Sequence, residues 1–162
     1  MKLTKIILFV LIPLMFVSCV TLEPVSVTRN APLYSLYNYT YFYITPTETK
    51  VSGYGGIYGN FALYESKSTN PADVISGYLI KRGMVRLPEV KSDLLEKTMI
   101  INYSETGRRQ TSLGGYTIEI TLQVLSAKTN EVLCVITGEG QGSTEADDIR
   151  IAINRCLDEM YK

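Results

Sequence analysis

Few side chains in this 162-residue sequence combine the type and spacing needed for catalysis. The chain contains no histidine, so it lacks the commonest general base near neutral pH and the commonest metal ligand. A serine–histidine triad is therefore excluded, and Cys134 has no histidine to activate it as a nucleophile. Cys134 and Cys156 together with carboxylates match no standard set of zinc ligands. We therefore expect neither a cofactor nor a metal site.

An acidic cluster near the C-terminus is the other candidate for chemistry. Glu145, Asp147 and Asp148 lie within four residues, whereas a calcium-binding EF-hand loop spreads its oxygen ligands over twelve. Thr144 directly before them is a good helix cap, and carboxylates in a first turn stabilise a helix. The cluster is therefore interpreted as helix stabilisation. A carboxylate-dependent glycan hydrolase is the weakest functional alternative, and we expect no enzyme.

Four tyrosines recur at every second position in the segment "LYNYTYFYITP". This alternation predicts a β-strand with Tyr37, Tyr39, Tyr41 and Tyr43 on one side. Exposed tyrosines offer a large apolar ring with a polar tip, which suits contacts with proteins or sugars. Tyrosine is also common in strands for steric reasons. The row is thus either a candidate contact surface or a set of rings packed within the protein.

The N-terminus carries the pattern of an export signal. Lys2 and Lys5 precede an uncharged apolar run over residues 6–17, which is too short to span a bilayer as a helix. The following residues, "FVSC", resemble the lipobox of bacterial lipoproteins. That resemblance implies removal of residues 1–18 and lipidation of Cys19. Several acyl chains give stable anchoring, so we expect a protein held on a membrane through lipid at Cys19.

The residues after Cys19 bear on location and domain organisation. No acidic residue follows Cys19 directly, and by resemblance to lipoprotein sorting rules this favours the outer membrane, facing the periplasm. Residues 19–32 contain two prolines and no helical period, which predicts a flexible tether. Residues 33–162 then form one domain.

Charge and cysteine content narrow the partners further. The full chain has 16 basic and 16 acidic residues, and loss of Lys2 and Lys5 with the signal makes it slightly acidic. Such a balance offers no attraction to nucleic acid. An oxidising compartment permits a disulfide between Cys134 and Cys156, but both occupy apolar-face positions, which favours two buried thiols.

The rest of the chain predicts an α+β domain with a single, mainly antiparallel sheet and two helices packed on one face. One helix begins at the Asn70 cap and ends before Gly83, and the last begins at Thr144. A short strand is expected at 84–87, another from Thr98, a loop at 104–114, and a hairpin from 116 to 137 that turns at 128–130.

These features together resemble a group of small envelope lipoproteins, a domain-of-unknown-function family common in Bacteroides-like bacteria. The resemblance rests on "YTYFYITP", "YLIKRGM", "TMIINYS" and the hairpin exit "VITGEG", with Leu79 and Gly83 at the helix end and Val135, Gly138 and Gly140 at the exit. It implies no catalytic residues. The expected function is non-catalytic binding or scaffolding of an envelope protein or glycan. The alternative is an accessory subunit that activates or assembles a larger envelope machine for secretion or cell-wall synthesis.

Overall fold

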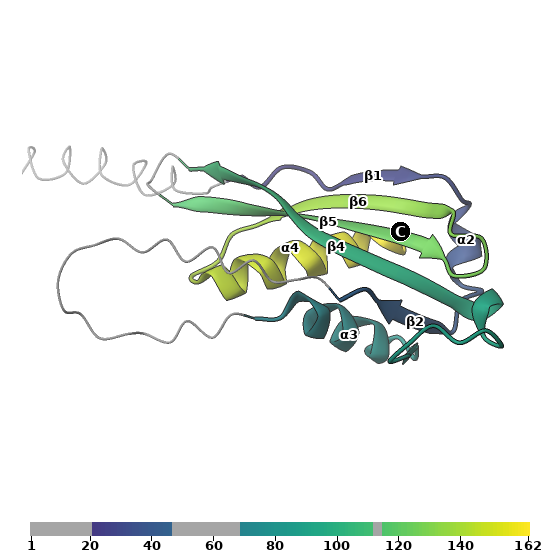
Figure 1. Ribbon diagram of the computed structural model, residues 1–162. Helices are drawn as coiled ribbons and strands as arrows, with labels where there is room; N and C mark the ends of the chain where they lie inside the picture. Colours follow the sequence, from purple (N-terminus) through teal and green to yellow (C-terminus); the bar gives the residue numbers. More distant parts are fainter. Residues whose placement is uncertain (1–20, 47–68, 112–114) are drawn as a thin grey trace, which may run out of the picture.

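The computed structural model describes residues 21–46, 69–111 and 115–162 (Figure 1). Its elements in chain order are β1 (Ser26–Arg29), α2 (Leu33–Leu36), β2 (Tyr41–Ile44), α3 (Pro71–Lys81), β3 (Val85–Arg86), the 3-10 helix η1 (Leu95–Lys97), β4 (Thr98–Gln110), β5 (Tyr116–Ser126), β6 (Val132–Gly140) and α4 (Glu145–Met160). The predicted α+β class with one sheet is confirmed.

The six strands form a mixed sheet in the order β1-β6-β5-β4-β2-β3. Pairing is antiparallel from β1 through β6 and β5 to β4, whereas β2 runs parallel to both β4 and β3. The sheet is therefore not purely antiparallel. The chain leaves β2, passes through α3 and returns beside it as β3, and this crossover makes the β2–β3 pair parallel.

The first strand lies within the range predicted as a tether. Residues 26–29 pair antiparallel with β6, with Ser26 opposite Thr137 and Arg29 opposite Cys134. The Arg29 guanidinium donates hydrogen bonds to the carbonyl oxygens of Glu159 and Met160 at the end of α4. The folded part of the chain thus begins well before residue 33, and the prediction of a flexible tether is wrong for these residues.

Local capping signals place both long helices where the sequence predicts them. The Asn70 side chain accepts a hydrogen bond from the Ala72 backbone N–H at 3.0 Å, and Gly83 after the helix has φ 84°. At α4, the Thr144 hydroxyl oxygen accepts from the Asp147 N–H at 3.2 Å. These side chains satisfy backbone groups that helix ends leave unpaired.

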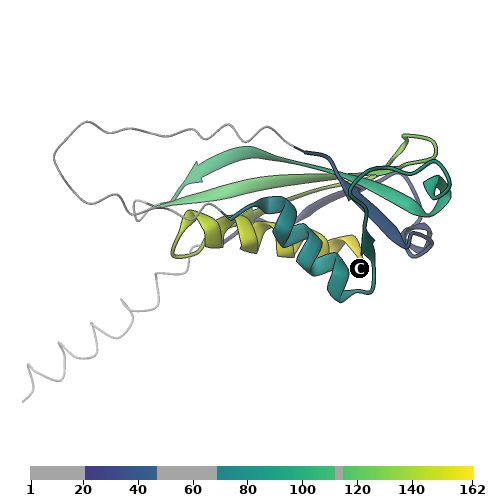
Figure 2. The same ribbon diagram turned by 60° about the horizontal axis from the view of Figure 1, so that its bottom comes forward.

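The helices lie on one side of the sheet in Figure 2, with α4 against β5 and β6 and α3 beside α4. The approach of α4 to β6 depends on glycine. A Cβ atom built on Gly140 would lie 1.9 Å from the Asp148 carbonyl oxygen and 2.6 Å from the Ala152 nitrogen. Only a residue without a side chain permits this contact.

The core fills the space between sheet and helices. Alternate residues of β5 are fully or almost fully buried beneath α4, namely Ile118, Ile120, Leu122 and Val124. From α4 the buried apolar residues are Ala152, Ile153, Cys156, Leu157 and Met160. Ile151, which lies off this apolar face, approaches Gly142: its Cδ1 atom is 3.3 Å from where a Cβ on that glycine would stand.

The β4–β5 hairpin is longer than the sequence predicts. Residues 104–110, expected to be part of a loop, continue β4 and pair with β5 as far as Tyr116, with an irregularity between Glu105 and Gly107. The predicted turn between β5 and β6 is confirmed, and Asn130 adopts a φ of 59° there.

Candidate functional site

The four tyrosines of the predicted row do not share one surface. Tyr41 and Tyr43 belong to β2 and are half-buried on the sheet face opposite the helices. Their strand neighbours Phe42 and Ile44 are buried in the core, as the alternation predicts. These two tyrosines therefore lie on the face that α4 leaves uncovered.

The other two tyrosines of the row precede the strand. Residues 33–36 form the helix α2, whose last residue Leu36 is buried in the core, and β2 begins only at Tyr41. Tyr39 packs against that core. Tyr37 is 62% exposed; its ring centroid lies 5.8 Å from that of Tyr161, and its hydroxyl donates to the Tyr161 carbonyl oxygen at 3.3 Å. Tyr37 and Tyr39 are thus separate from the strand.

We call the sheet face that bears Tyr41 and Tyr43 the open face, since none of the described helices lies across it (Figure 2). Three strands contribute a row of threonines to it. The hydroxyl oxygens of Thr121 and Thr137 are 2.8 Å apart, and those of Thr106 and Thr121 are 3.1 Å apart. Such cross-strand hydroxyl pairs hold side chains at fixed positions on a sheet.

A second row of uncharged polar groups crosses the same face toward β2. The Thr45 hydroxyl donates to the Asn102 Oδ1 atom at 2.6 Å, and the Asn102 amide donates to Gln123 Oε1 at 3.1 Å. Ile100, two residues before Asn102, pairs with Tyr43. The open face therefore combines ordered hydroxyl and amide groups with two tyrosine rings.

An ion-pair cluster fastens the first described residues to the ends of β4 and β6. Arg109 binds Glu139 through two hydrogen bonds, Nε to Oε1 at 2.9 Å and Nη2 to Oε2 at 2.7 Å. Arg109 Nη2 also donates to the Thr21 carbonyl oxygen at 3.4 Å, and the Glu23 N–H donates to Glu139 Oε2 at 2.9 Å. Arg155 of α4 donates to the carbonyl oxygens of Glu139 and Glu23. We call Arg109, Glu139 and Arg155 the N-terminal clamp.

Glu139 is the charged centre of this clamp. Its side chain is only 7% exposed, and it also accepts a hydrogen bond from the buried Thr117 hydroxyl at 3.3 Å. The hydrogen-bonded Arg109 guanidinium, with the Glu23 N–H and Thr117, lowers the pKa of Glu139 to about 2 against the opposing effect of burial. Glu139 therefore stays ionised and cannot act as a general acid near neutral pH.

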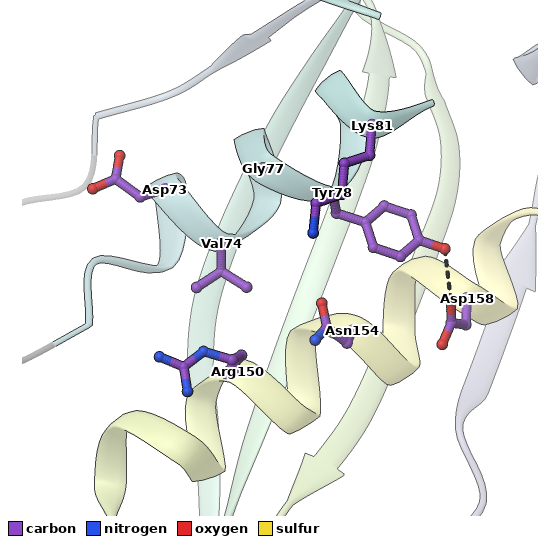
Figure 3. A pocket seen from close by; sticks show the side chains of 8 residues that line it. All are labelled: Asp73, Val74, Gly77, Tyr78, Lys81, Arg150, Asn154 and Asp158. Carbon is purple, nitrogen blue, oxygen red and sulfur yellow. Dashed lines mark hydrogen bonds between the residues drawn. The ribbon is translucent and has the colours of Figure 1, made fainter. Parts of the chain in front are cut away.

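A shallow groove of about 520 Å³ runs between α3 and α4 on the side away from the sheet (Figure 3). Gly77 and Tyr78 line it from α3, and Asn154 and Asp158 line it from α4. The Tyr78 hydroxyl donates to Asp158 Oδ1 at 2.7 Å and accepts from Arg82 at 2.8 Å. Burial and the Asp158 contact raise the pKa of Tyr78. The groove thus holds a paired tyrosine, poorly suited to acid–base chemistry at neutral pH.

The acidic cluster at the start of α4 has structural partners. Asp148 is buried and accepts a hydrogen bond from the Gly142 N–H, while Glu145 accepts from Arg108 at 2.7 Å. Asp147 pairs with Arg150 at 2.8 Å. These contacts agree with the predicted role in stabilising the helix N-terminus. Within the described ranges, no group of three or more cysteine, aspartate and glutamate residues is arranged to hold a metal ion.

The two C-terminal cysteines are free thiols buried in the core, as predicted. Burial raises the pKa of Cys134 to about 11 and that of Cys156 to about 12. The Cys156 thiol points to the Ile120 carbonyl oxygen at 3.7 Å. Both are therefore inert packing residues near neutral pH.

Sequence reasoning missed the clamp and both polar rows. Arg109 lay in a predicted loop, and Glu139 in a segment expected to end its strand. The threonine row had a weak signal, because Thr117, Glu119, Thr121 and Gln123 alternate with the apolar residues of β5. Nothing in the sequence joins Arg109 to Glu139.

Cys19 lies outside the described residues. In the part of the chain that the structure describes, no helix is long and apolar enough to cross a membrane.

No family model and no curated protein matches the sequence. Among solved structures, the chain is similar to the PelC dodecamer from Paraburkholderia phytofirmans, with a TM-score of 0.51, 16% identity, and coverage of 83% of this chain and 96% of that one. It is also similar to a PDZ domain protein from Parabacteroides distasonis, with a TM-score of 0.50 and 11% identity, covering 86% of this chain but 35% of that one. At these identities the likeness concerns the fold alone.

Proposed function

We propose that the protein is a non-catalytic binding module of the bacterial envelope, anchored through lipid at Cys19 to the outer membrane on its periplasmic side. In this proposal α3 and α4 shield one face of the sheet, and the open face binds an envelope protein. The observation that supports it is the set of ordered polar groups on that face: the threonine row with the Glu119 carboxylate that accepts from Thr106, the amide row, and the rings of Tyr41 and Tyr43.

The shape and chemistry of the open face favour a protein partner over a small ligand. Sites for small molecules are concave, whereas a sheet face is broad and only gently twisted. The sheet has six strands, and at about 4.8 Å spacing its outermost strands lie roughly 24 Å apart, comparable to one side of a standard protein interface. The polar groups predict an interface that is hydrated and reversible.

The carboxylates give little support to the hydrolase alternative. Glu139 is held ionised by Arg109, Glu145 binds Arg108, and Asp148 accepts a backbone N–H. Glycosidases need one carboxyl with a raised pKa beside an ionised partner. The contacts of Glu139 have the opposite effect on its pKa.

A photo-crosslinking amino acid at Tyr43 tests the proposed surface in living cells. We expect a discrete protein adduct from position 43 and none from position 37, an exposed tyrosine away from the open face. A Gln123→Lys change, which puts a charge among neutral side chains, should reduce the adduct at least tenfold without altering the melting temperature. This second variant distinguishes a specific surface from incidental capture.

Three results would contradict the proposal: equal adducts from positions 37 and 43, an adduct indifferent to Gln123→Lys, or an adduct removed by glycan-degrading enzymes. The last result would instead identify a polysaccharide as the partner.

The anchor requires its own test. The Cys19→Ala variant should keep residues 1–18 and carry no lipid. Mass spectrometry should therefore find the full-length chain without the added mass of acyl groups. An unchanged mass of the Cys19 peptide between wild type and variant, apart from the substitution itself, would refute lipidation. Recovery of mature wild-type protein from the culture fluid in unmodified form would refute it too.

A second candidate function is assembly of a larger envelope machine, with this chain as a repeated accessory subunit. The likeness in fold to the PelC dodecamer favours it, because the match covers nearly all of that chain. Native mass spectrometry of the detergent-solubilised protein should then show a defined homo-oligomer. A monomer at all accessible concentrations would leave binding of a different protein as the proposed function.

A further inference from the structure

The position of Thr21 limits how far the fold can stand from a lipid at Cys19. Two peptide units connect Cys19 to Thr21 in the sequence. An extended chain spans at most about 3.6 Å per residue, so the Cys19 Cα lies within about 7 Å of the Thr21 Cα whatever the backbone conformation. The headgroup layer of a bilayer is roughly 5–8 Å thick on each side.

Residues 21–29 are attached to the folded domain along their length. Arg109 binds the Thr21 carbonyl oxygen, and Glu139 and Arg155 bind the backbone of Glu23. A methyl group of Val25 would lie 3.4 Å from a Cβ on Gly138, and β1 then pairs with β6. A free linker over residues 19–32 would instead extend about 20 Å on average.

We infer that the N-terminal clamp seats the domain directly on the lipid headgroups, with the end of the sheet that carries Arg109, Gln110 and Tyr116 toward the membrane. This inference rests on the lipid anchor proposed above. The partner of this end of the sheet is the surface of the bilayer. It must lie close because only two peptide units separate Cys19 from Thr21, which Arg109 binds.

The chemistry of this end of the sheet suits an interface between water and lipid. Tyr116 is 37% exposed, and the Arg108 guanidinium lies 5.1 Å from the centroid of its ring. Tyrosine and arginine side chains place an apolar body in the interface and a polar tip in water. Arg108 and Arg109 are both paired with glutamates, so this end has no excess of positive charge that would require anionic lipid.

The opposite end of the sheet should then lie far from the lipid. Val85 in β3 pairs with Tyr41, which pairs with Thr98 at the start of β4. Along β4, Thr98 and Gln110 are separated by about 40 Å at 3.3 Å per residue. Gln110 and Val85 are both exposed, so labels at these two sites report the two ends.

The test uses the full, lipidated protein in phosphatidylethanolamine–phosphatidylcholine vesicles that contain a fraction of headgroup-quencher lipid. A fluorophore is attached to Gln110→Cys or Val85→Cys. The buried Cys134 and Cys156 should not react under native conditions because their pKa values are raised, and a lipidated Cys19 has no free thiol. We expect at least threefold stronger quenching at position 110 than at position 85.

Arg109→Gln then tests the clamp, with Arg150→Gln as the matched control. Arg150 is an exposed arginine of α4 that pairs with Asp147 and belongs neither to the clamp nor to the end of the sheet that carries Arg109, Gln110 and Tyr116. Arg109→Gln should reduce quenching at position 110 at least twofold, and Arg150→Gln should leave it within experimental error. Circular dichroism confirms that both variants remain folded.

The possible failures are distinct. Protein that does not float with the vesicles and lacks lipid by mass spectrometry would refute the proposed anchor. Lipidated, vesicle-bound protein with equal quenching at positions 85 and 110 would refute the orientation while the anchor stands. Unequal quenching that Arg109→Gln leaves unchanged would refute the role of the clamp.

Discussion

Replacement of Gly140 by alanine should separate α4 from the sheet and destabilise the protein strongly. The added Cβ would lie 1.9 Å from the Asp148 carbonyl oxygen, whereas contacts shorter than 3.0 Å require something to move. The nearest atoms belong to the helix backbone, so α4 must shift by about 1 Å or more. Overpacking of this kind costs typically 1–3 kcal/mol, and here we expect about 3 because no flexible side chain can yield.

Gly77→Ala is the matched control for this prediction. It makes the same chemical change in the middle of α3, where an added Cβ would meet nothing within 4 Å. Alanine should therefore stabilise the helix by about 0.5–1 kcal/mol. A change of 1 kcal/mol shifts the melting temperature of a domain of this size by about 4 °C. The melting temperature should therefore fall by about 12 °C for Gly140→Ala and rise by about 2–4 °C for Gly77→Ala. A Gly140→Ala variant that melts within about 2 °C of wild type would refute the packing of α4 on β6.

Three further predictions concern ionisation, thiols and capping. The free energy of unfolding should fall as the pH drops from about 4.5 toward 2, because Glu139 in the unfolded chain takes up a proton near its ordinary pKa of 4.5, whereas the folded carboxylate is protonated only near its pKa of about 2. Glu139→Gln should make this loss of stability with falling pH smaller. The same pH dependence in wild type and variant, measured by urea unfolding, would contradict this. Cys134 and Cys156 should react with Ellman's reagent at pH 8 only in denaturant, and rapid reaction in the native state would show that they are accessible. Thr144→Ala should lower stability by about 1 kcal/mol through loss of the α4 cap, measured by urea unfolding against Ser143→Ala.

The helix ends could be predicted from sequence because their causes are local. Asn70 and Thr144 bind N–H groups two and three residues ahead, and Gly83 and Asn130 adopt the positive φ values that their residue types favour. None of these contacts depends on the rest of the fold. Short-range chemistry of this kind leaves a pattern that can be read along the chain.

The pairing of the strands could not be predicted, because its partners are distant in sequence. β1 has only four residues and gains its stability from β6, more than a hundred residues later. β2 pairs in parallel with residues of β4 that lie 57 positions later in the chain. The tyrosine row was misjudged because the alternating pattern extends before Tyr41, whereas residues 33–36 form a helix and the strand begins only at Tyr41.

The polar end of β4 illustrates why the clamp was invisible in the sequence. Residues 104–110 lack an apolar face and are mostly exposed, and such a segment is indistinguishable from a loop by pattern alone. Pairing with β5 makes it a strand and brings Arg109 to Glu139. The contact between Arg109 and Glu139 therefore joins two segments that the sequence predicts to be a loop and the end of a strand.

The clamp also links the proposed anchor to the proposed contact surface. Glu139 lies on β6, two residues after Thr137 of the threonine row. The side chains of both therefore lie on the open face, whereas Gly138 and Gly140 lie on the face that contacts α4. A chain fixed at Glu139 therefore holds the open face at a set angle to the attachment point. If the sheet stands on the membrane by its Arg109 end, the threonine and amide rows face sideways along the bilayer. A partner that is itself attached to the same membrane would then meet this face without any rotation of the domain.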